Sequence, residues 1–314
     1  MTGAVVAYRH PEALASTQWL ADRLDDPSVR VVDARFDLRA TAGGALEGVA
    51  ERDAYREAHI PGAVFVDVMS DLSDLDDPVV VVSPDRFEAL MGRLGIANDS
   101  TVVVYDDRGG TWAARLWWVL RYYGHDAVKL LDGGFTRWEA EGRAVEQQVP
   151  EPLPANFKAL IRPALRVDAD QVMDAIGRDD VCIVDALPEP FFTGRACLYP
   201  NHRAGHIPTA HNIPAPANVD PATHTLLPAA DLARLWAPVA LEPSLRVITY
   251  CGGGVFGAFA LFALYVMGHE NAALYDASWM EWGADPCRPV EAGPRGETSH
   301  RHGSSEPPQV PRRK

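Results

Sequence analysis

Short runs of apolar and β-branched residues alternate along this chain with segments whose apolar positions have helical spacing. The run Val247 to Tyr250 predicts a strand buried on both faces, and the apolar segment Ala258 to Met267 predicts a buried helix that ends at Gly268. Earlier in the chain, Ser16 and Ser83 are candidate N-terminal caps of helices. Because strands and helices alternate, the pattern predicts an α/β fold whose parallel sheets are covered by helices on both faces.

The predicted elements occur twice in the same order, and the two copies can be matched residue by residue. Matching positions are about 145 residues apart, far more than the period of a solenoid, so each copy is expected to be a whole domain. In this match Cys251 stands where the first copy has Asp106. The matched segments are 30–34 with 181–186, 58–63 with 205–210, 102–105 with 247–250, 124–125 with 268–269, and 131–138 with 275–282.

The duplication and the positions of the prolines predict the domain boundaries. We expect a first domain over residues 1–148 and a second over residues 163–290. The segment 149–162 contains the stretch Pro-Glu-Pro-Leu-Pro and is predicted to be a stiff linker. Residues 291–314 are polar and rich in proline, glycine and serine, so a disordered tail is expected there. Within the first domain, the glycine-rich segment 41–50 is predicted to be a loop.

Composition narrows the class of protein. With 314 residues, of which 47% are hydrophobic, the chain is long enough for two globular domains with sizeable cores. Its net charge of −14 argues against a nucleic-acid or anionic-membrane partner. The longest apolar stretch, 255–267, is too short to span a bilayer and no secretory segment is recognised, so we expect a cytoplasmic protein. The four cysteines show neither zinc nor disulfide spacing.

Cys251 follows the predicted strand and opens a glycine-rich turn before the predicted helix. Glycines at such a junction let the backbone turn its N–H groups inward, which forms an anion site at the positive end of the helix. A thiolate placed there is stabilised, so we expect a lowered thiol pKa and a nucleophilic cysteine. The alternative is a small buried hydrophobic residue beside a tight turn. The residues expected around the sulfur are Gly252, Gly253, Gly254, Val255, Phe256 and Gly257.

Several motifs recur in fixed order in the two copies: a Val-Asp-Ala strand, a His-Ile-Pro turn, a hydrophobic strand that ends at position 106 or 251, and a final Asp-Gly-Gly or Asp-Ala-Ser with Trp. Over residues 10–290 they resemble a tandem rhodanese-type sulfurtransferase. The resemblance implies that Cys251 is catalytic and that the first domain is an inactive partner whose loops close the cleft. It also implies that the thiolate takes the outer sulfur of a donor, holds it as a persulfide and passes it to an acceptor. This chemistry needs no metal or organic cofactor.

The loop after the cysteine resembles one type of this family more than the other. Members that favour thiosulfate commonly carry Arg and Lys there, whereas those that favour 3-mercaptopyruvate carry Cys-Gly-Ser/Thr-Gly-Val-Thr. The loop of this chain is uncharged and is closer to the second type, although Gly253 replaces the hydroxyl residue and Phe256 replaces the Thr. We therefore expect 3-mercaptopyruvate rather than thiosulfate as the donor. A thiol or cyanide is the expected acceptor, with a thioredoxin-like or other protein as a further candidate.

An anionic donor needs cationic contacts. The resemblance implies Arg195, which matches a Phe-x-Gly-Arg position of the family, and Arg203, which matches an arginine common near the second His-Ile-Pro turn. His59 and His206 are expected to orient their turns through hydrogen bonds. Cys197 is expected to be a bystander thiol, and a regulatory disulfide with the catalytic cysteine is its alternative role.

Three alternative functions stay open. The first is a thiosulfate sulfurtransferase proper, and the second is a sulfur carrier that delivers its persulfide to a biosynthetic partner. The third is a cysteine-dependent phosphatase or arsenate reductase, which also places a thiolate in a strand-loop-helix anion site. Those enzymes end the loop with an arginine, and this chain has no basic residue from Gly252 to Met267, which argues against the third function.

Overall fold

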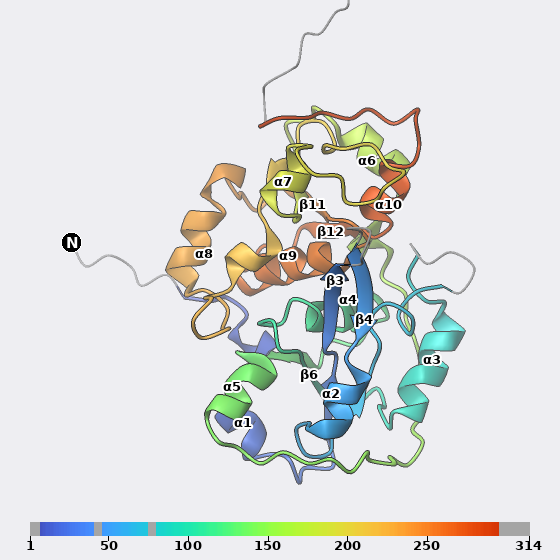
Figure 1. Cartoon of the computed structure of the whole chain (residues 1–314), viewed down its shortest axis with the longest axis vertical. Coiled ribbons are helices and arrows are strands. Elements are labelled where there is room, and N and C mark those ends of the chain that lie inside the picture. Colours follow the sequence, from blue (N-terminus) through green and yellow to red (C-terminus); the bar gives the residue numbers. More distant parts are fainter. Residues whose placement is uncertain (1–6, 41–45, 75–79, 295–314) are drawn as a thin grey trace, which may run out of the picture.

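The structure, a computed structural model, describes residues 7–40, 46–74 and 80–294. They form two domains that lie one above the other in Figure 1, each built around a parallel sheet. In the described part of the chain each of these sheets has five strands. The strand order is β1-β7-β6-β2-β5 in the first domain and β8-β12-β11-β9-β10 in the second, so equivalent strands occupy equivalent places. The predicted fold class is confirmed.

In the first domain, helices cover both faces of the sheet because its central strands are apolar on both sides. Val103 and Tyr105 of β6 pack with α1 and α5 on one face, whereas Val102 and Val104 pack with α3 and α4 on the other. The strands are β1 (Leu14–Ala15), β2 (Val29–Asp33), β5 (Val64–Phe65), β6 (Thr101–Tyr105) and β7 (Val128–Leu131). The helices are α1 (Thr17–Ala21), α2 (Arg52–Glu57), α3 (Pro84–Arg93), α4 (Ala113–Tyr122) and α5 (Gly134–Ala140), with a 3-10 turn at Pro11–Ala13.

The second domain repeats this arrangement. Ile248 and Tyr250 of β11 pack with α6 and α10, whereas Val247 packs with α8 and α9 on the other face. The strands are β8 (Arg166–Val167), β9 (Val181–Asp185), β10 (His211–Asn212), β11 (Arg246–Tyr250) and β12 (Ala272–Tyr275). The helices are α6 (Ala169–Ala175), α7 (Glu189–Phe192), α8 (Ala229–Leu235), α9 (Val255–Val266) and α10 (Ser278–Trp282), with 3-10 turns at Pro163–Leu165, Ala215–Asn218 and Ala237–Val239.

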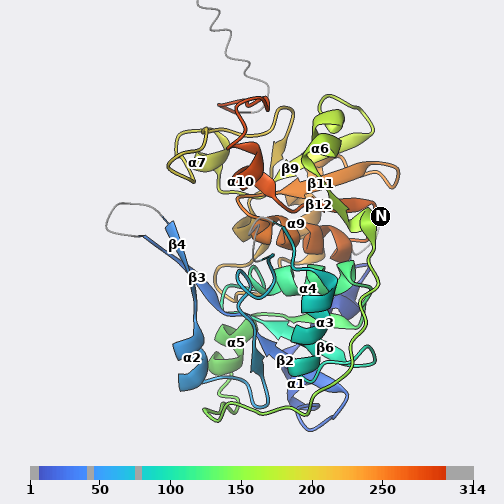
Figure 2. The same ribbon diagram turned by 90° about the vertical axis from the view of Figure 1, so that its right-hand side faces the viewer.

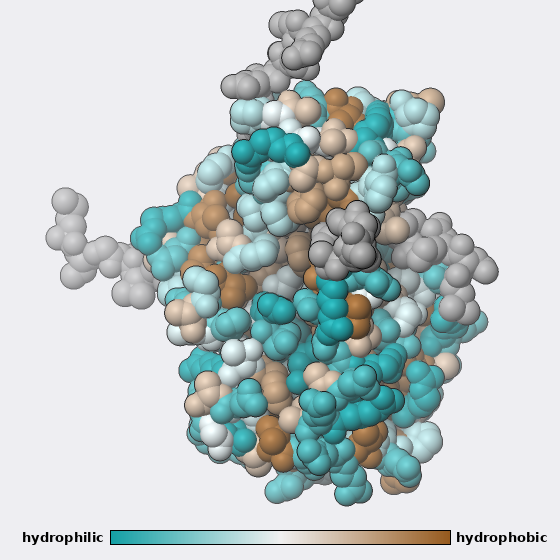
Figure 3. Space-filling model, viewed as in Figure 1, coloured by the Kyte–Doolittle hydropathy of each residue, from teal (hydrophilic) through white to brown (hydrophobic). Residues whose placement is uncertain are grey.

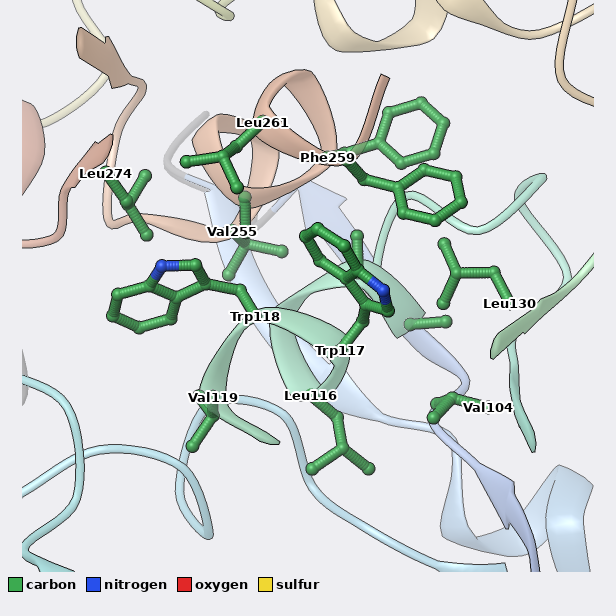
Figure 4. Packing of buried hydrophobic residues seen from close by; sticks show 14 of the residues in the cluster. Val104, Leu116, Trp117, Trp118, Val119, Leu130, Val255, Phe259, Leu261 and Leu274 are labelled. Atoms are coloured by element: carbon green, nitrogen blue, oxygen red, sulfur yellow. The ribbon is translucent and has the colours of Figure 1, made fainter. Parts of the chain in front are cut away.

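The two domains share one hydrophobic core, in which the equivalent helices α4 and α9 face each other. Figure 4 shows Trp117 of α4 beside Phe259 of α9, and the Trp117 ring packs edge-on against Phe262 with centroids 5.0 Å apart. Arg115 of α4 forms a buried ion pair with Asp276 of the second domain. With this apolar and ionic contact, the interface holds the carboxyl end of β11 close to the first domain.

A β-hairpin of the first domain reaches towards the second. Strands β3 (Phe36–Ala40) and β4 (Leu46–Ala50) pair antiparallel, with Leu38 opposite Gly48. The prediction of a loop over 41–50 is therefore wrong for residues 46–50, and residues 41–45 lie outside the described ranges. In Figure 1 the hairpin extends from the lower domain towards the upper one, and Figure 2 shows that it projects from one side of the molecule. It thereby brings first-domain side chains close to the loop after β11.

The predicted linker and the first residues of the predicted tail are held against the domains. Residues 150–162 contain no helix or strand but follow the surface of the first domain, where Ala155 N donates to Gly92 O at 2.9 Å and the Phe157 side chain is buried. Glu291 pairs with His206 through two backbone hydrogen bonds of 2.8 and 3.0 Å, so the start of the predicted tail belongs to the second domain. Residues 295–314 lie outside the described chain. None of the helices in the described ranges is long and apolar enough to cross a membrane.

Candidate active site

Cys251 is the first residue after β11, and the start of α10 fixes the loop that follows it. The Ser278 hydroxyl accepts hydrogen bonds from Cys251 N at 3.1 Å and Gly254 N at 3.2 Å and donates one to Tyr275 O at 2.8 Å. Trp279 N in turn donates to Cys251 O at 3.0 Å. Ser278 has a φ of 55°, a left-handed conformation that costs a non-glycine residue about 1–2 kcal/mol. This cost is offset by the hydrogen bonds through which the serine holds the loop.

The Cys251 sulfur accepts backbone hydrogen bonds from the N–H groups of Gly257, Gly253 and Phe256, as the glycine-rich turn predicts. The thiol is nevertheless almost completely buried, with a relative exposure of 3%. Burial raises the pKa of the Cys251 thiol above its usual value, and the N–H groups offset this effect only in part. The expectation of a lowered pKa is therefore wrong for this structure, because the sequence shows the N–H donors but not the loss of water around the sulfur.

A second buried acid lies near this sulfur. Asp185 ends β9 next to Tyr250 and is fully buried, and its Oδ1 accepts a hydrogen bond from Leu187 N at 2.8 Å. Burial raises the pKa of Asp185 to about 7. Its carboxylate charge also contributes to the raised pKa of Cys251. The negative charge that sulfur chemistry requires thus develops next to a carboxyl group that is itself reluctant to ionise.

The thiol lines a pocket of about 200 Å³ between the two domains. The first domain supplies its hairpin, the segment around Met69 and the start of α4, and the second domain supplies the cysteine loop and three neighbouring segments. None of the described lining residues has a charged side chain. The lining residues are Phe36, Leu38, Gly48, Met69, Trp112, Leu187, Leu198, Tyr199, Cys251, Gly252, Gly253, Val255, Phe256 and Met280.

The residues of the predicted loop divide into two groups. Gly252, Gly253, Val255 and Phe256 line the pocket, and a Cβ at Gly252 would lie 2.6 Å from Cδ2 of Leu198 and 2.9 Å from the Tyr199 hydroxyl, so a larger residue there would displace these two side chains. Gly254 and Gly257 are needed for the backbone conformation and for close packing instead. Gly254 has a φ of 79° where α9 begins, and a Cβ at Gly257 would lie 2.7 Å from Leu274 of β12.

The structure does not bring Arg195 and Arg203 into the described lining of this pocket. The Arg195 side chain is 66% exposed, forms an ion pair with Glu189 and donates to Thr193 Oγ1 at 3.3 Å. Arg203 donates to backbone carbonyls at the end of the second domain, where it joins the segment after α10 to the second His-Ile-Pro turn. The carbonyls are those of Trp282, Gly283, Asp285 and Arg288.

The other polar residues selected from the sequence hold turns. Nδ1 of His59 is 2.7 Å from Tyr55 O, and Nδ1 of His206 is 2.8 Å from Phe192 O. The Cys197 thiol donates to Tyr199 O at 2.9 Å, in the segment that covers the Cys251 loop. In the described chain no group of acidic, histidine or cysteine side chains is arranged to hold a metal ion.

Sequence reasoning missed three components of the site: the hairpin with Phe36 and Leu38, Tyr199 above the loop, and Ser278 beneath it. For the hairpin, the alternation of apolar and polar residues from Phe36 to Ala40 was a strand signal. For Ser278, the signal lies in the comparison of the two copies. Ser278 stands where the first copy has Gly134, which has a φ of 56°, so the comparison of the copies could have marked a strained and functionally constrained serine. The hairpin and Tyr199 lie in segments without a counterpart motif in the other copy.

A cysteine whose sulfur meets backbone N–H groups where a parallel strand runs into a helix defines a class of α/β proteins with a nucleophilic thiol. The family model described as Rhodanese-like domain matches this chain twice, over residues 16–141 and 168–285. The chain therefore belongs to the rhodanese family of sulfurtransferases, as its motifs predicted.

Similar proteins match along nearly the whole chain. The sulfur carrier protein TtuD of Thermus thermophilus is 34% identical over 301 residues, which cover 92% of this chain and 99% of that protein. A thiosulfate sulfurtransferase of Rattus norvegicus is 33% identical over 93% of this chain and 98% of its own length. The crystal structure of SseA from Escherichia coli, a 3-mercaptopyruvate sulfotransferase, matches with a TM-score of 0.73 and 31% identity over 85% of this chain and 98% of that chain.

Proposed function

We propose that Cys251 is the nucleophile of a sulfurtransferase and carries sulfur as a persulfide between a small donor and a thiol or cyanide acceptor. The observation that carries the proposal is the position of its sulfur, which lines the pocket between the domains and meets the N–H groups of Gly253, Phe256 and Gly257. Such N–H groups stabilise negative charge on the cysteine sulfur before transfer and on the persulfide after it. All other cysteines of the described chain lie outside the lining of the pocket.

The reaction takes place in two displacements on sulfur. With 3-mercaptopyruvate, the Cys251 thiolate attacks the donor sulfur, an S–S bond forms, and the C–S bond breaks with its electron pair leaving on the enolate of pyruvate, which is then protonated. In the second step the acceptor thiolate attacks the outer sulfur of the persulfide. The S–S bond to Cys251 breaks, the acceptor leaves as a persulfide, and the cysteine thiolate is restored. These two successive displacements predict ping-pong kinetics.

The pocket supports 3-mercaptopyruvate over thiosulfate as the donor. No charged side chain is found among its described lining residues, and the burial of a doubly charged donor without a cation costs more than that of a singly charged one. The likeness to SseA, named for 3-mercaptopyruvate, agrees with this preference. The relative from rat is named for thiosulfate and the one from Thermus for sulfur carriage, so both alternatives are tested beside it.

Intact-protein mass spectrometry tests the persulfide directly. Addition of 3-mercaptopyruvate should increase the mass of the protein by one sulfur atom, and Cys251→Ser should abolish the increase whereas Cys287→Ser, at an exposed cysteine outside the pocket lining, should retain it. Sulfur retained by the Cys251→Ser variant would refute the assignment. Values of kcat/KM for 3-mercaptopyruvate and thiosulfate, with cyanide and a dithiol as acceptors, then rank the donors. Negligible turnover with small acceptors, together with transfer to a protein acceptor, would select the sulfur-carrier alternative.

A further inference from the structure

Aromatic rings from both domains form one continuous wall of the pocket above Cys251. The Phe36 and Trp112 rings have centroids 4.9 Å apart, and the Trp112 and Phe256 rings have centroids 5.5 Å apart. Phe36 and Trp112 belong to the first domain and Phe256 to α9 of the second, so the wall exists only where the domains meet. Leucine and methionine side chains provide much of the remaining surface. Together they form an apolar chamber with one reactive thiol in its lining.

Nothing in the described lining compensates for a negative charge carried on the body of a substrate. The arginines of the neighbouring segment are engaged elsewhere, Arg195 with Glu189 and Arg203 with backbone carbonyls. Asp185 lies buried close enough to raise the pKa of the thiol. Figure 3 shows hydrophobic residues exposed around the junction of the domains, whereas the surface over α2 is mainly hydrophilic. A charged group in this chamber would lose its water without gaining a partner.

The size of the chamber suits a ring or a branched chain. An apolar cavity of about 150 Å³ is large enough to hold benzene, and this one measures about 200 Å³. Both substrates of a ping-pong enzyme use the same chamber, but their chemical requirements differ. The proposed donor, 3-mercaptopyruvate, carries a carboxylate as part of its structure. The acceptor needs only a thiolate sulfur, and the rest of its body is free to be apolar.

We propose that the sulfur acceptor of this protein is a thiol with an uncharged aromatic or branched aliphatic body, which is held by the Phe36–Trp112–Phe256 wall. The proposal rests on the proposed function of Cys251. The acceptor thiolate attacks the outer persulfide sulfur, forms a new S–S bond and leaves as an apolar persulfide, while the electron pair of the broken S–S bond returns to Cys251. The negative charge thus stays on sulfur atoms near the loop N–H groups, and only the apolar body lies against the wall.

A single-turnover experiment separates the two proposals. The full-length protein is first loaded with sulfur from 3-mercaptopyruvate, loading is verified by mass, and the excess donor is removed. The loss of the persulfide is then timed with 2-mercaptoethanol, propanethiol, benzyl mercaptan and 2-mercaptoethanesulfonate. Each methylene that the acceptor buries should increase the rate constant of discharge about fourfold. We therefore expect benzyl mercaptan to discharge the persulfide about 50-fold or more faster than 2-mercaptoethanol. The sulfonate should be slower than 2-mercaptoethanol by about tenfold.

Two substitutions in the wall and its surroundings test the location. Leu38→Ser changes a pocket residue on the hairpin, and Phe256→Thr removes one ring of the wall. Leu38 is exposed and Phe256 is only partly buried, so neither substitution removes a fully buried core side chain. Each should reduce the ratio of the benzyl mercaptan rate to the 2-mercaptoethanol rate by about fivefold. Leu153→Ser, at an exposed leucine outside the pocket, is the matched control and should leave the ratio unchanged.

The possible outcomes distinguish a failure of the acceptor proposal from a failure of the proposed function of Cys251. A loaded protein that discharges all uncharged thiols at equal rates, or that prefers the sulfonate, overturns the proposed acceptor class and leaves the function of Cys251 intact. A preference that survives both wall substitutions shows that the chamber does not select the acceptor, and it also overturns the proposal. If no sulfur is loaded on Cys251, the proposed function fails and the acceptor proposal fails with it.

Discussion

The two domains form equivalent rings of backbone N–H groups after equivalent strands and fill them with different side chains. In the first domain the buried carboxylate of Asp106 accepts four backbone hydrogen bonds at 2.6–2.9 Å, whereas in the second domain the Cys251 sulfur lies among N–H groups at matching positions. The ring is therefore a product of the fold, and the residue inside it decides whether the loop is structural or reactive. The donors to Asp106 are the N–H groups of Arg108, Gly110, Trp112 and Ala113.

A second difference lies one strand away. Asp33 of the first domain is fully buried and forms an ion pair with Arg35 at 2.7 Å. In the second domain the matching residues are Asp185 and Leu187, so the buried carboxyl group has lost its cation and the leucine lines the pocket instead. The reactive domain therefore keeps an acid that burial keeps partly protonated near neutral pH. The first domain therefore pairs its buried carboxylate with a cation, and the second keeps a carboxyl group that burial makes reluctant to ionise beside its thiol.

The largest expected effect comes from giving the second ring the occupant of the first. Cys251→Asp places a carboxylate among N–H groups that match those around Asp106, so the protein should stay folded while sulfur transfer falls by about 10⁴-fold or more, as expected when a nucleophile is removed. Steady-state transfer and thermal unfolding together check this outcome. Cys287→Asp, at an exposed cysteine, is the control for added charge. Measurable turnover by Cys251→Asp would show that the ring does not need its sulfur.

The buried ion pair of the first domain should be sensitive to the loss of either charge. Asp33→Asn leaves the Arg35 guanidinium buried without a counter-charge and should lower the free energy of unfolding by about 3–5 kcal/mol. Urea unfolding followed by circular dichroism measures this loss. Arg56→Gln, at an exposed pair with Asp53, is a control that should cost at most about 1 kcal/mol. Equal costs for the two variants would contradict the contrast between the domains.

The matching substitution in the second domain, Asp185→Asn, should increase the free energy of unfolding relative to the wild type as the pH rises. Burial raises the pKa of Asp185 to about 7, so the folded state binds this proton more tightly than the unfolded state, whose carboxyl group ionises near 3.8. The stability that the group contributes is complete below pH 3.8 and is lost as the pH rises to about 7, on the order of 4 kcal/mol at most. Asp185→Asn removes this dependence. Relative to the wild type, the variant should therefore gain stability between pH 4 and 8, and a difference that does not change with pH would refute the raised pKa.

Much of the fold could be predicted because its signals are local and occur twice. The β-branched runs of β2, β6 and β11 and the cap at Ser16 are visible in short windows of sequence. In the structure the Ser16 hydroxyl accepts a hydrogen bond from Trp19 N at 3.0 Å. The hairpin was not predicted. Its strands pair only with each other, and β4 contains Gly48 and lies in a glycine-rich segment that is typical of a loop, although Phe36 to Ala40 alternate apolar and polar residues.

The site could be predicted only as far as the cysteine loop. Its N–H groups follow from the glycine pattern, but its walls come from residues as distant in sequence as Phe36 and Met280, which only the docking of the domains brings together. The burial that raises the pKa of Cys251 is likewise not visible in the sequence of the loop. Arg195 matches a family position in the sequence, but a match does not give the direction of a side chain, and in the structure this one turns to Glu189.

The raised pKa of Cys251 predicts a steep pH dependence for the reactive ring. Burial disfavours the thiolate, so sulfur loading should increase by about tenfold for each pH unit between about pH 6 and 8 rather than reach a plateau there. The rate of alkylation of the free protein by iodoacetamide, with intact mass as the readout, should follow the same curve. A flat profile over this range would mean that the N–H groups outweigh burial and that the thiolate is already formed at neutral pH.

The smallest expected effect concerns Arg195, which the sequence motif predicts to contact the donor and which the structure places outside the described lining of the pocket. The motif predicts that Arg195 holds the donor, in which case Arg195→Ala should raise the KM for 3-mercaptopyruvate by tenfold or more, the usual scale for a charged contact. In the structure its guanidinium is exposed and paired with Glu189, outside the described lining, so we expect an increase of at most about twofold. Glu189→Ala, which frees the arginine, is the matched variant and should lower the KM if Arg195 can swing towards the pocket. A tenfold rise for Arg195→Ala would mean that donor binding draws this arginine out of its ion pair, and the chamber would then gain a charge that it lacks when empty.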